Sequence, residues 1–196
     1  MVDFKSGLRR AVALVAVLNL AYFGVEFAVA LSIGSVSLFA DSIDFLEDAS
    51  INGLILVALG WSAYKRSLLG MVLAGILLAP GVATVWMAWQ KIGSPIPPAA
   101  VPLTLAGTGA LVVNVCCAFI LARFKKDRSS LTRAAFLSAR NDSIANVAII
   151  GAGIVTAATV SVWPDLIVGV GIFAMNLQAA REVFLAAKAE HADAKA

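Results

Sequence analysis

Six long apolar segments, separated by short turns, restrict this chain to one broad class of fold. We place the segments at residues 8–31, 38–62, 68–91, 98–122, 132–158 and 164–187. Each reaches the ~20 residues that an α-helix needs to cross the hydrocarbon core of a bilayer. Because 61% of the residues are hydrophobic and only 14% are charged, a soluble globular domain is excluded. The sequence therefore predicts an all-α integral membrane protein with six transmembrane helices.

The basic residues lie on one side of this topology. The chain has fifteen Lys and Arg, and all but two lie in residues 5–10, 65–66, 123–133 and 181–195. The exceptions are Lys91, near the opposite face, and Arg140, within a span. Since cytoplasmic loops carry the excess of Lys and Arg, we expect both termini to be cytoplasmic. The net charge of +3 reflects this rule and gives no reason to expect nucleic acid as a partner.

The predicted spans leave little of the chain over. We expect residues 1–187 to form one transmembrane domain and residues 188–196 to form a short disordered cytoplasmic tail. The expected location is the bacterial cytoplasmic (inner) membrane. The two cysteines, Cys116 and Cys117, are adjacent and diverge by about 100° on a helix, so we expect packing roles and no disulfide.

Four acidic residues interrupt the second apolar segment at Asp41, Asp44, Glu47 and Asp48. An ionised carboxylate within a bilayer costs at least a few kcal/mol, so such residues usually serve a function. On a helix, Asp41, Asp44 and Asp48 share an arc of roughly 80° with Asn52, because they are spaced three and four apart. Glu47 lies to one side of this stripe, and we expect it to pair with a neighbour. The stripe predicts a cation site.

A second polar stripe lies in the fifth segment, where Ser138, Asp142 and Asn146 are spaced four apart. With Asp44 and Asp48 they supply carboxylate, hydroxyl and amide oxygens, which suit divalent cations. The metal needs the carboxylates deprotonated, so metal binding should release protons. The accessory candidates for the site are Asp41, Asn52, Asn141, Asn146 and Glu26.

The segment 34–49, G-S-V-S-L-F-A-D-S-I-D-F-L-E-D-A, resembles the second transmembrane helix of cation diffusion facilitator transporters. In that family a G-S-x-(A/S)-L-x-A-D stretch precedes an (H/D)-x-x-x-D pair, onto which Asp44 and Asp48 fall. The family's second such pair, in the fifth helix, maps onto Ser138 and Asp142. The resemblance covers residues 8–187, and the first helix also fits its pattern.

The resemblance implies a six-helix membrane protein that exports a divalent metal from the cytoplasm in exchange for protons, by alternating access. It implies a metal site of Asp44, Asp48, Asp142 and Ser138, a homodimer, and no cofactor besides the transported ion. Ser138 stands where a histidine or aspartate is usual, which favours a permissive oxygen site for zinc, cadmium, manganese, iron or cobalt. Compared with the family, we expect a compact member without the cytoplasmic C-terminal domain.

Two alternatives remain open from the sequence. A transport-inactive relative with a structural or regulatory role would explain the serine at position 138. A magnesium-dependent CDP-alcohol phosphotransferase also clusters aspartates in a membrane, and Asp41-x-x-Asp44 superficially resembles its motif. Phe45 follows where that motif has glycine, and its later elements are missing, so we do not expect an enzyme.

Overall fold

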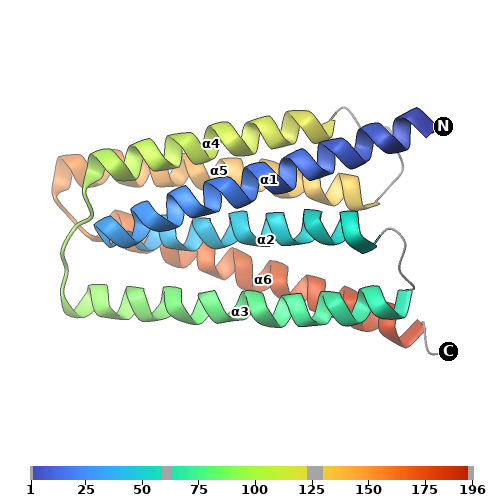
Figure 1. Cartoon of the computed structure of the whole chain (residues 1–196). Helices are drawn as coiled ribbons and strands as arrows, with labels where there is room; N and C mark the ends of the chain where they lie inside the picture. The colour runs from blue at the N-terminus through green and yellow to red at the C-terminus, as the bar shows by residue number, and fades with distance from the viewer. Residues whose placement is uncertain (1, 59–62, 123–129, 194–196) are drawn as a thin grey trace.

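The structure, a computed structural model, describes residues 2–58, 63–122 and 130–193. These residues form six α-helices and no strand (Figure 1). Their bounds are α1 Val2–Ile33, α2 Val36–Ala58, α3 Ala63–Gly93, α4 Ala100–Ala122, α5 Ser130–Thr159 and α6 Trp163–Asp193. Each helix matches one predicted span, with α4 beginning two residues after the predicted start at 98, so the predicted six-helix fold is confirmed.

The helices form an elongated bundle with the first and last residues described at the same end (Figure 1). We call this the termini end. The short connections α1–α2, α3–α4 and α5–α6 lie at the opposite end, which we call the turn end. α1 and α6 extend beyond the predicted spans at the termini end, and α6 continues as helix to Asp193. Residues 188–193 of the predicted tail continue α6 as helix, because alanine, lysine and glutamate in A-K-A-E-H-A are good helix formers.

Helix α2 lies in the middle of the bundle and contacts each of the other five helices. It also carries the four acidic residues of the second apolar segment. Among the described residues, three segments are long and apolar enough to cross a membrane by themselves, at 7–33, 100–122 and 141–159. α2 is not among them, and its central position explains how so polar a helix belongs to a membrane protein. Its neighbours shield it from lipid.

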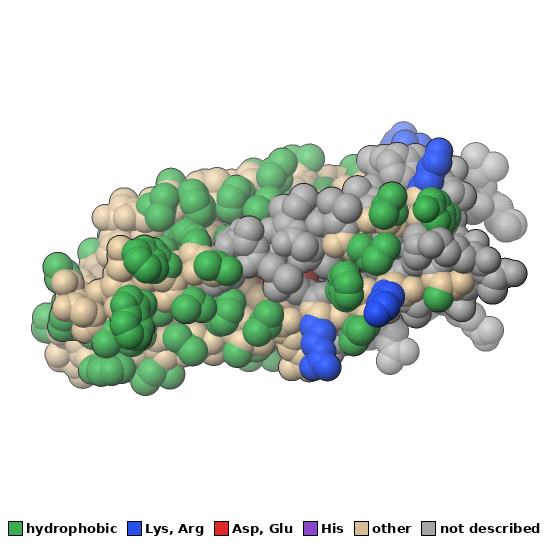
Figure 2. Space-filling view, turned by 90° about the horizontal axis from the view of Figure 1, so that it is seen from below, with side chains coloured by type: hydrophobic (Ala, Val, Ile, Leu, Met, Phe, Trp, Pro, Cys, Tyr) green, Lys and Arg blue, Asp and Glu red, His purple; other side chains and the backbone are tan. Residues whose placement is uncertain are grey.

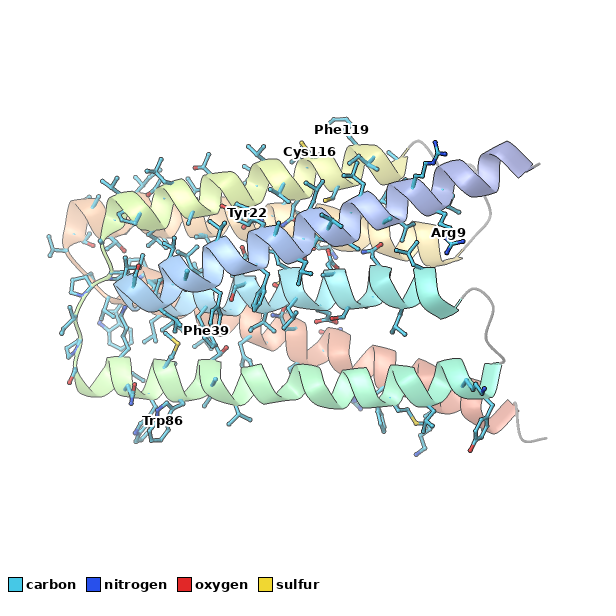
Figure 3. The ribbon with its side chains drawn as sticks, in the orientation of Figure 1. Arg9, Tyr22, Phe39, Trp86, Cys116 and Phe119 are labelled. Atoms are coloured by element: carbon cyan, nitrogen blue, oxygen red, sulfur yellow. The ribbon has the colours of Figure 1, made fainter. Side chains whose placement is uncertain are left out.

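Polar and apolar side chains are distributed in the reverse of the pattern of a soluble protein. Large apolar side chains face outward on the described surface, as Phe119 at 70% exposure and Trp86 at 61% illustrate (Figure 3). In contrast, Asn19, Glu26 and Asn146 are fully buried between helices. A surface of this kind is stable when lipid covers it, and buried polar groups then contact other helices.

The turn between α1 and α2 is built from local backbone chemistry. Gly34 adopts a left-handed conformation with φ of 62°, which an L side chain would strain. The N–H of Ser35 donates to the carbonyl of Ala30 at 3.0 Å, closing the end of α1. Ser35 Oγ then accepts the N–H of Leu38 at 3.2 Å and caps the start of α2. The sequence G-S-V-S-L thus fixes the first residue of the acidic helix.

Small residues allow close packing of α4 against α5. A Cβ atom added at Gly107 would lie 2.8 Å from Cγ2 of Ile149, and one at Gly153 would lie 2.3 Å from Oγ1 of Thr104. Close approach at small residues is the usual way in which membrane helices associate. This contact holds α5, with its polar stripe, at a fixed position in the bundle.

Candidate metal site

A pocket of about 130 Å³ opens among α2, α5 and α6. We call it the carboxylate pocket, and it is lined by Asp44, Glu47, Asp48, Asn141, Asp142, Met175 and Asn176. The first three residues come from α2, the next two from α5 and the last two from α6. Asp44, Asp48 and Asp142, which the sequence placed in one site, therefore lie on one pocket. Their binding of metal stays a prediction.

The burial of these side chains varies across the pocket. Glu47 and Asp48 are buried, Asp44 and Asp142 are partly exposed, and Asn141 is exposed. The partly exposed carboxylates give an ion a way into the pocket.

Negative charge accumulates at Asp44. Its carboxyl group lies close enough to Asp142, Asp41, Glu47 and Asp48 for their charges to act on it. The residues lining the carboxylate pocket in the described structure include no lysine or arginine. Like charges held together in a medium of low dielectric constant repel one another strongly. A cation, or protons bound to some of the carboxyl groups, would remove this repulsion.

The carboxylates line the pocket without forming a closed coordination shell. Within residues 2–58, 63–122 and 130–193, no three His, Cys, Asp or Glu side chains are grouped closely enough to hold one metal ion. Binding by three carboxylates would thus require rotamer changes or a closer approach of α2 and α5. Both are compatible with partly exposed side chains at Asp44 and Asp142.

The accessory candidates divide between the pocket and its surroundings. Asn141 lines the pocket, whereas Asn52 does not: its amide donates to the carbonyl of Asp48 on its own helix at 2.8 Å. Asn146 is fully buried outside the pocket, and neither polar atom of its side chain has a partner among the described residues. Ser138 lies in α5 one turn before Asp142, but its side chain lies outside the described part of the chain.

Glu26 and Asp41 form a second acidic pair, between α1 and α2. Both are fully buried, and their carboxyl groups lie within hydrogen-bonding reach of each other. No described residue donates a hydrogen bond to any of their four oxygens. Neither residue lines the carboxylate pocket, although both lie close enough to Asp44 for their charges to interact with it. Their burial without a donor is costly unless a proton or a cation accompanies them.

Three lining residues were not among the candidates from sequence, namely Glu47, Met175 and Asn176. Glu47 stands at about 60° from Asp44 at 100° per residue, and the pocket is wide enough to include it. Asn176 donates from Nδ2 to the carbonyl of Ala40 at 3.4 Å, which joins α6 to α2. A single amide in the apolar run G-I-F-A-M-N-L was a signal for Asn176 that could have been used.

A buried thiol lies close to the pocket. Cys117 of α4 donates from Sγ to Oδ1 of Asn19 at 3.7 Å, and the charges of Asp48 and Asp142 reach it. Cys116, its neighbour, is exposed (Figure 3). The two cysteines point in different directions and are not bonded, as their adjacency predicts.

The sequence matches the family described as cation efflux transmembrane domain over residues 12–189, which include α2 to α5 and most of α1 and α6. The chain belongs to the cation efflux family. A comparison with curated proteins gives no match. Members of the cation efflux family are transporters of divalent metal cations and not enzymes. The chain is therefore an integral membrane protein and a metal cation transporter of the cation diffusion facilitator kind, and the phosphotransferase alternative is disfavoured.

Proposed function

We propose that this cation efflux protein exports a divalent transition metal from the cytoplasm in exchange for protons, by alternating access. The observation that carries the proposal is the meeting of Asp44, Asp48 and Asp142, from two helices, on one pocket in the bundle. Buried carboxylates in a membrane are expensive, and a site for a transported cation accounts for them. Alternating access follows from a site between helices that can face either side in turn.

Proton coupling follows from the chemistry of the ligands. Carboxylates bind metal only in their deprotonated form, so a metal ion entering the pocket displaces protons, and protons displace the metal. The buried pair Glu26 and Asp41 lies near Asp44 and adds two more groups whose charge must be balanced. Protons that move among these carboxyl groups would enter the cytoplasm along the same path by which the metal leaves it.

The proposed orientation of the protein in the membrane, on which the direction of export depends, rests on the placement of basic residues. On the face shown in Figure 2, the visible Lys and Arg side chains lie in the half of the molecule toward the termini end, and hydrophobic side chains cover the other half. By the positive-inside rule the termini end faces the cytoplasm and the turn end faces the outer side. We take the bacterial cytoplasmic membrane as the location.

The metal is proposed from the donor set. Carboxylate and amide oxygens of the carboxylate pocket suit manganese, iron and cobalt as well as zinc and cadmium, and affinity order alone does not select one. Ser138 would add a hydroxyl or hold a water, and no resident cofactor is needed. By analogy with the family we propose a homodimer, for which the mass of the protein in mild detergent and in lipid discs is the test.

The proposal is tested by uptake into proteoliposomes, with zinc, cadmium, manganese, iron and cobalt supplied in turn under an imposed pH gradient. Wild-type protein should take up at least one metal at a rate that depends on the gradient. Asp48→Asn should abolish this uptake. The matched control is Ser50→Ala on the same helix, because Ser50 donates only to the carbonyl of Leu46 one turn away. Equal uptake by wild type and Asp48→Asn would contradict the proposal.

A transport-inactive relative is the second candidate, and one observation favours it. No three potential ligands are grouped closely enough in the described residues to hold a metal. Metal-dependent release of protons from the purified protein separates the two candidates. A transporter releases protons when metal is added, whereas a relative without a working site shows neither heat nor proton release.

A further inference from the structure

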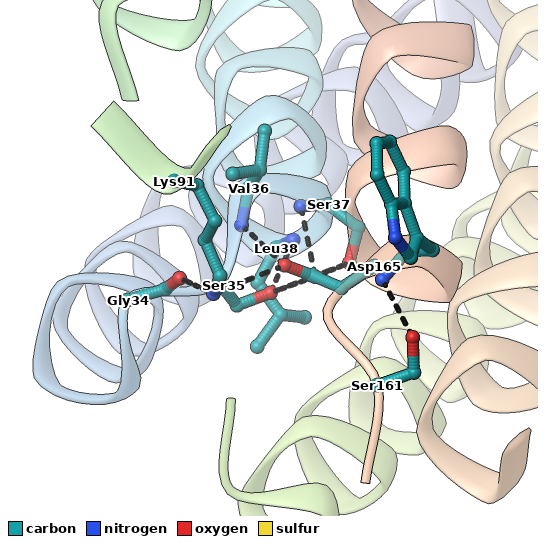
Figure 4. Close-up of polar contacts among 9 residues, drawn as sticks. Gly34, Ser35, Val36, Ser37, Leu38, Lys91, Ser161 and Asp165 are labelled. Atoms are coloured by element: carbon teal, nitrogen blue, oxygen red, sulfur yellow. Dashed lines mark hydrogen bonds and ion pairs between the residues drawn. The ribbon is translucent and has the colours of Figure 1, made fainter. Parts of the chain in front are cut away.

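A second polar network lies at the turn end, around the buried carboxylate of Asp165 in the first turn of α6 (Figure 4). Ser35 Oγ and Ser37 Oγ each donate a hydrogen bond of 2.6 Å to Oδ1 of Asp165. The N–H of Val36 donates to Oδ2 at 2.9 Å, and the N–H of Ser37 donates to Oδ1 at 3.2 Å. One carboxylate thus holds the N-terminus of α2 by two side chains and two backbone amides.

Lys91, in the last turn of α3, completes the network. Its Nζ lies 3.5 Å from Oδ2 of Asp165, and it donates a hydrogen bond to the carbonyl of Gly34. Both side chains of the ion pair are buried, with exposures of 8% and 0%. We call these residues the turn-end clasp: Gly34, Ser35, Val36, Ser37, Lys91 and Asp165. The clasp joins the start of α2 to the end of α3 and the start of α6.

The backbones of α2 and α6 also touch beside the clasp. A Cβ added at Gly169 would lie 2.7 Å from the carbonyl carbon of Val36 and 2.8 Å from the nitrogen of Ser37. These are backbone atoms that cannot rotate away. The approach of α6 to α2 at this point therefore needs a residue without a side chain, and it needs α2 to begin where Ser35 caps it.

The clasp lies at the turn end, on that side of the carboxylate pocket. On α2, Asp44 follows Ser37 by seven residues, about 10 Å along the helix. On α6, Asn176 follows Asp165 by eleven residues, about 16 Å. α2 and α6 both line the pocket, and both are tied by the clasp. A path from the pocket to the turn end between these two helices would have to pass the clasp.

The chemistry of the clasp suits two states. When the clasp is closed, the carboxylate of Asp165 is buried, and it accepts four hydrogen bonds and forms one ion pair. These contacts compensate for its loss of water. When α2 and α6 separate, water can reach Asp165, Lys91 and the serines, and each group exchanges a protein partner for water. A network of this kind favours either a closed or a hydrated arrangement over a partly broken one.

We propose that Asp165 is the latch of a gate at the turn end: the clasp keeps the carboxylate pocket closed to the outer side, and its release opens the pocket outward. The inference rests on the proposed function for its direction and for alternating access. Asp165 does not line the pocket, so it acts as a positioning residue through α2 and α6.

The test measures access to the pocket from the outer side. Cys116 and Cys117 are replaced by alanine, and Met175→Cys supplies a thiol on the pocket lining. A charged, membrane-impermeant thiol reagent is added outside right-side-out membrane vesicles, and the rate of labelling is measured. Lys91→Met, Asp165→Asn and Gly169→Val are then introduced one at a time. The matched control is Thr159→Ala, an exposed turn-end residue whose hydroxyl donates to Val155 of its own helix.

Lys91→Met and Asp165→Asn should each raise the labelling rate roughly tenfold, the factor that loss of one charge-assisted hydrogen bond gives. Gly169→Val reaches the same result without changing any charge, because its side chain would push α6 away from the backbone of α2. Zinc and manganese binding to the purified variants should be retained, since no side chain that lines the pocket is changed by the clasp substitutions. The Thr159→Ala control should be labelled at the same rate as the Met175→Cys parent protein.

Unchanged labelling in the clasp variants, with lowered thermal stability, would assign the clasp a structural role only and overturn the gate. If Asp165→Asn does not fold, Lys91→Met and Gly169→Val decide the question in the same assay. The proposed transport is judged separately by metal uptake of wild-type protein. Uptake without a change in labelling refutes the gate alone, and a change in labelling without uptake refutes the transport and leaves a gated pocket.

Discussion

Asp44→Asn should change the stability of the empty protein and its affinity for metal in opposite directions. Asp44 is the carboxylate on which four others act, namely Asp41, Glu47, Asp48 and Asp142. The substitution keeps the size of the side chain and removes its charge. Without metal, loss of like-charge repulsion should therefore stabilise the fold. With metal, loss of a charged ligand should weaken binding.

The magnitudes follow from simple electrostatics. Two unit charges at an effective dielectric constant of 20 repel by about 4 kcal/mol at about 4 Å, and by roughly half of that at twice the separation. Protons already bound to part of the cluster reduce the gain, so we expect a stabilisation of about 1–2 kcal/mol. For a chain of this size that corresponds to a rise in melting temperature of about 2–8 °C. Loss of a direct ligand should lower metal affinity at least about 100-fold, the upper end of what outer-shell partners contribute.

The assay uses purified protein in mild detergent. Thermal unfolding is followed by circular dichroism in the presence of a chelator, and zinc and manganese affinities are measured by titration calorimetry. Ser50→Ala, on the same helix, is the control and should leave both quantities near wild type. An Asp44→Asn protein that melts lower without metal, yet binds metal with wild-type affinity, would refute the assignment of Asp44 to a repulsive ligand cluster.

Three further predictions concern protons, selectivity and packing. Calorimetry in buffers of different ionisation enthalpy should show that protons are released when metal binds. The affinity for metal should fall as the pH is lowered from about 8 to about 5.5. A binding enthalpy that does not depend on the buffer, together with an affinity that does not change with pH, would contradict proton coupling. Ser138→His should raise affinity for zinc relative to manganese by adding a nitrogen ligand, and an unchanged ratio would mean that position 138 does not reach the metal. Gly107→Val should destabilise the fold by about 1–3 kcal/mol in thermal unfolding, because Ile149 fills the space, whereas Gly24→Ala, with open space around it, should not.

The helices were predictable from sequence because lipid sets a simple requirement. A span needs about twenty apolar residues, and the chain supplies six such segments. The ends were less predictable: α6 continues to Asp193 because alanine, lysine and glutamate still favour a helix once it has left the bilayer. Hydropathy does not detect that continuation. Helix propensity, read separately, does.

The pocket was predictable in part, and the division has a geometric cause. Spacings of three and four residues place Asp44 and Asp48 on one face of α2, and the structure brings Asp142 to the same pocket. The direction of the pocket within that face depends on where α5 and α6 pack. The pocket is lined by Glu47, which lies on one side of Asp44. It is not lined by Asp41 and Asn52, which lie on the other side, toward α1. The sequence of α2 alone contains no information on its neighbours.

The turn-end clasp lay beyond sequence reasoning for a similar reason. Its parts were visible separately: a G-S-V-S turn, a lone basic residue at Lys91 and an acidic residue in V-W-P-D. The pairings join residues 128 to 130 positions apart, and no local pattern specifies which turns meet. An isolated lysine near the face that the sequence predicts to be the outer one was nevertheless a signal that a buried partner was needed.

The central helix connects the two polar networks. α2 begins in the clasp, where Asp165 holds its first amides, and carries Asp44 and Asp48 about two to three turns deeper. A packed helix of this length moves as a stiff body, so a tilt that changes the distance between Asp48 and Asp142 must also displace its N-terminus. Metal in the pocket and hydrogen bonds in the clasp would then bias the same motion of α2. Coupling of this kind has a clear consequence: metal binding should change the outer labelling rate of the Met175→Cys protein with an intact clasp, and have much less effect when Gly169→Val has already separated α2 from α6.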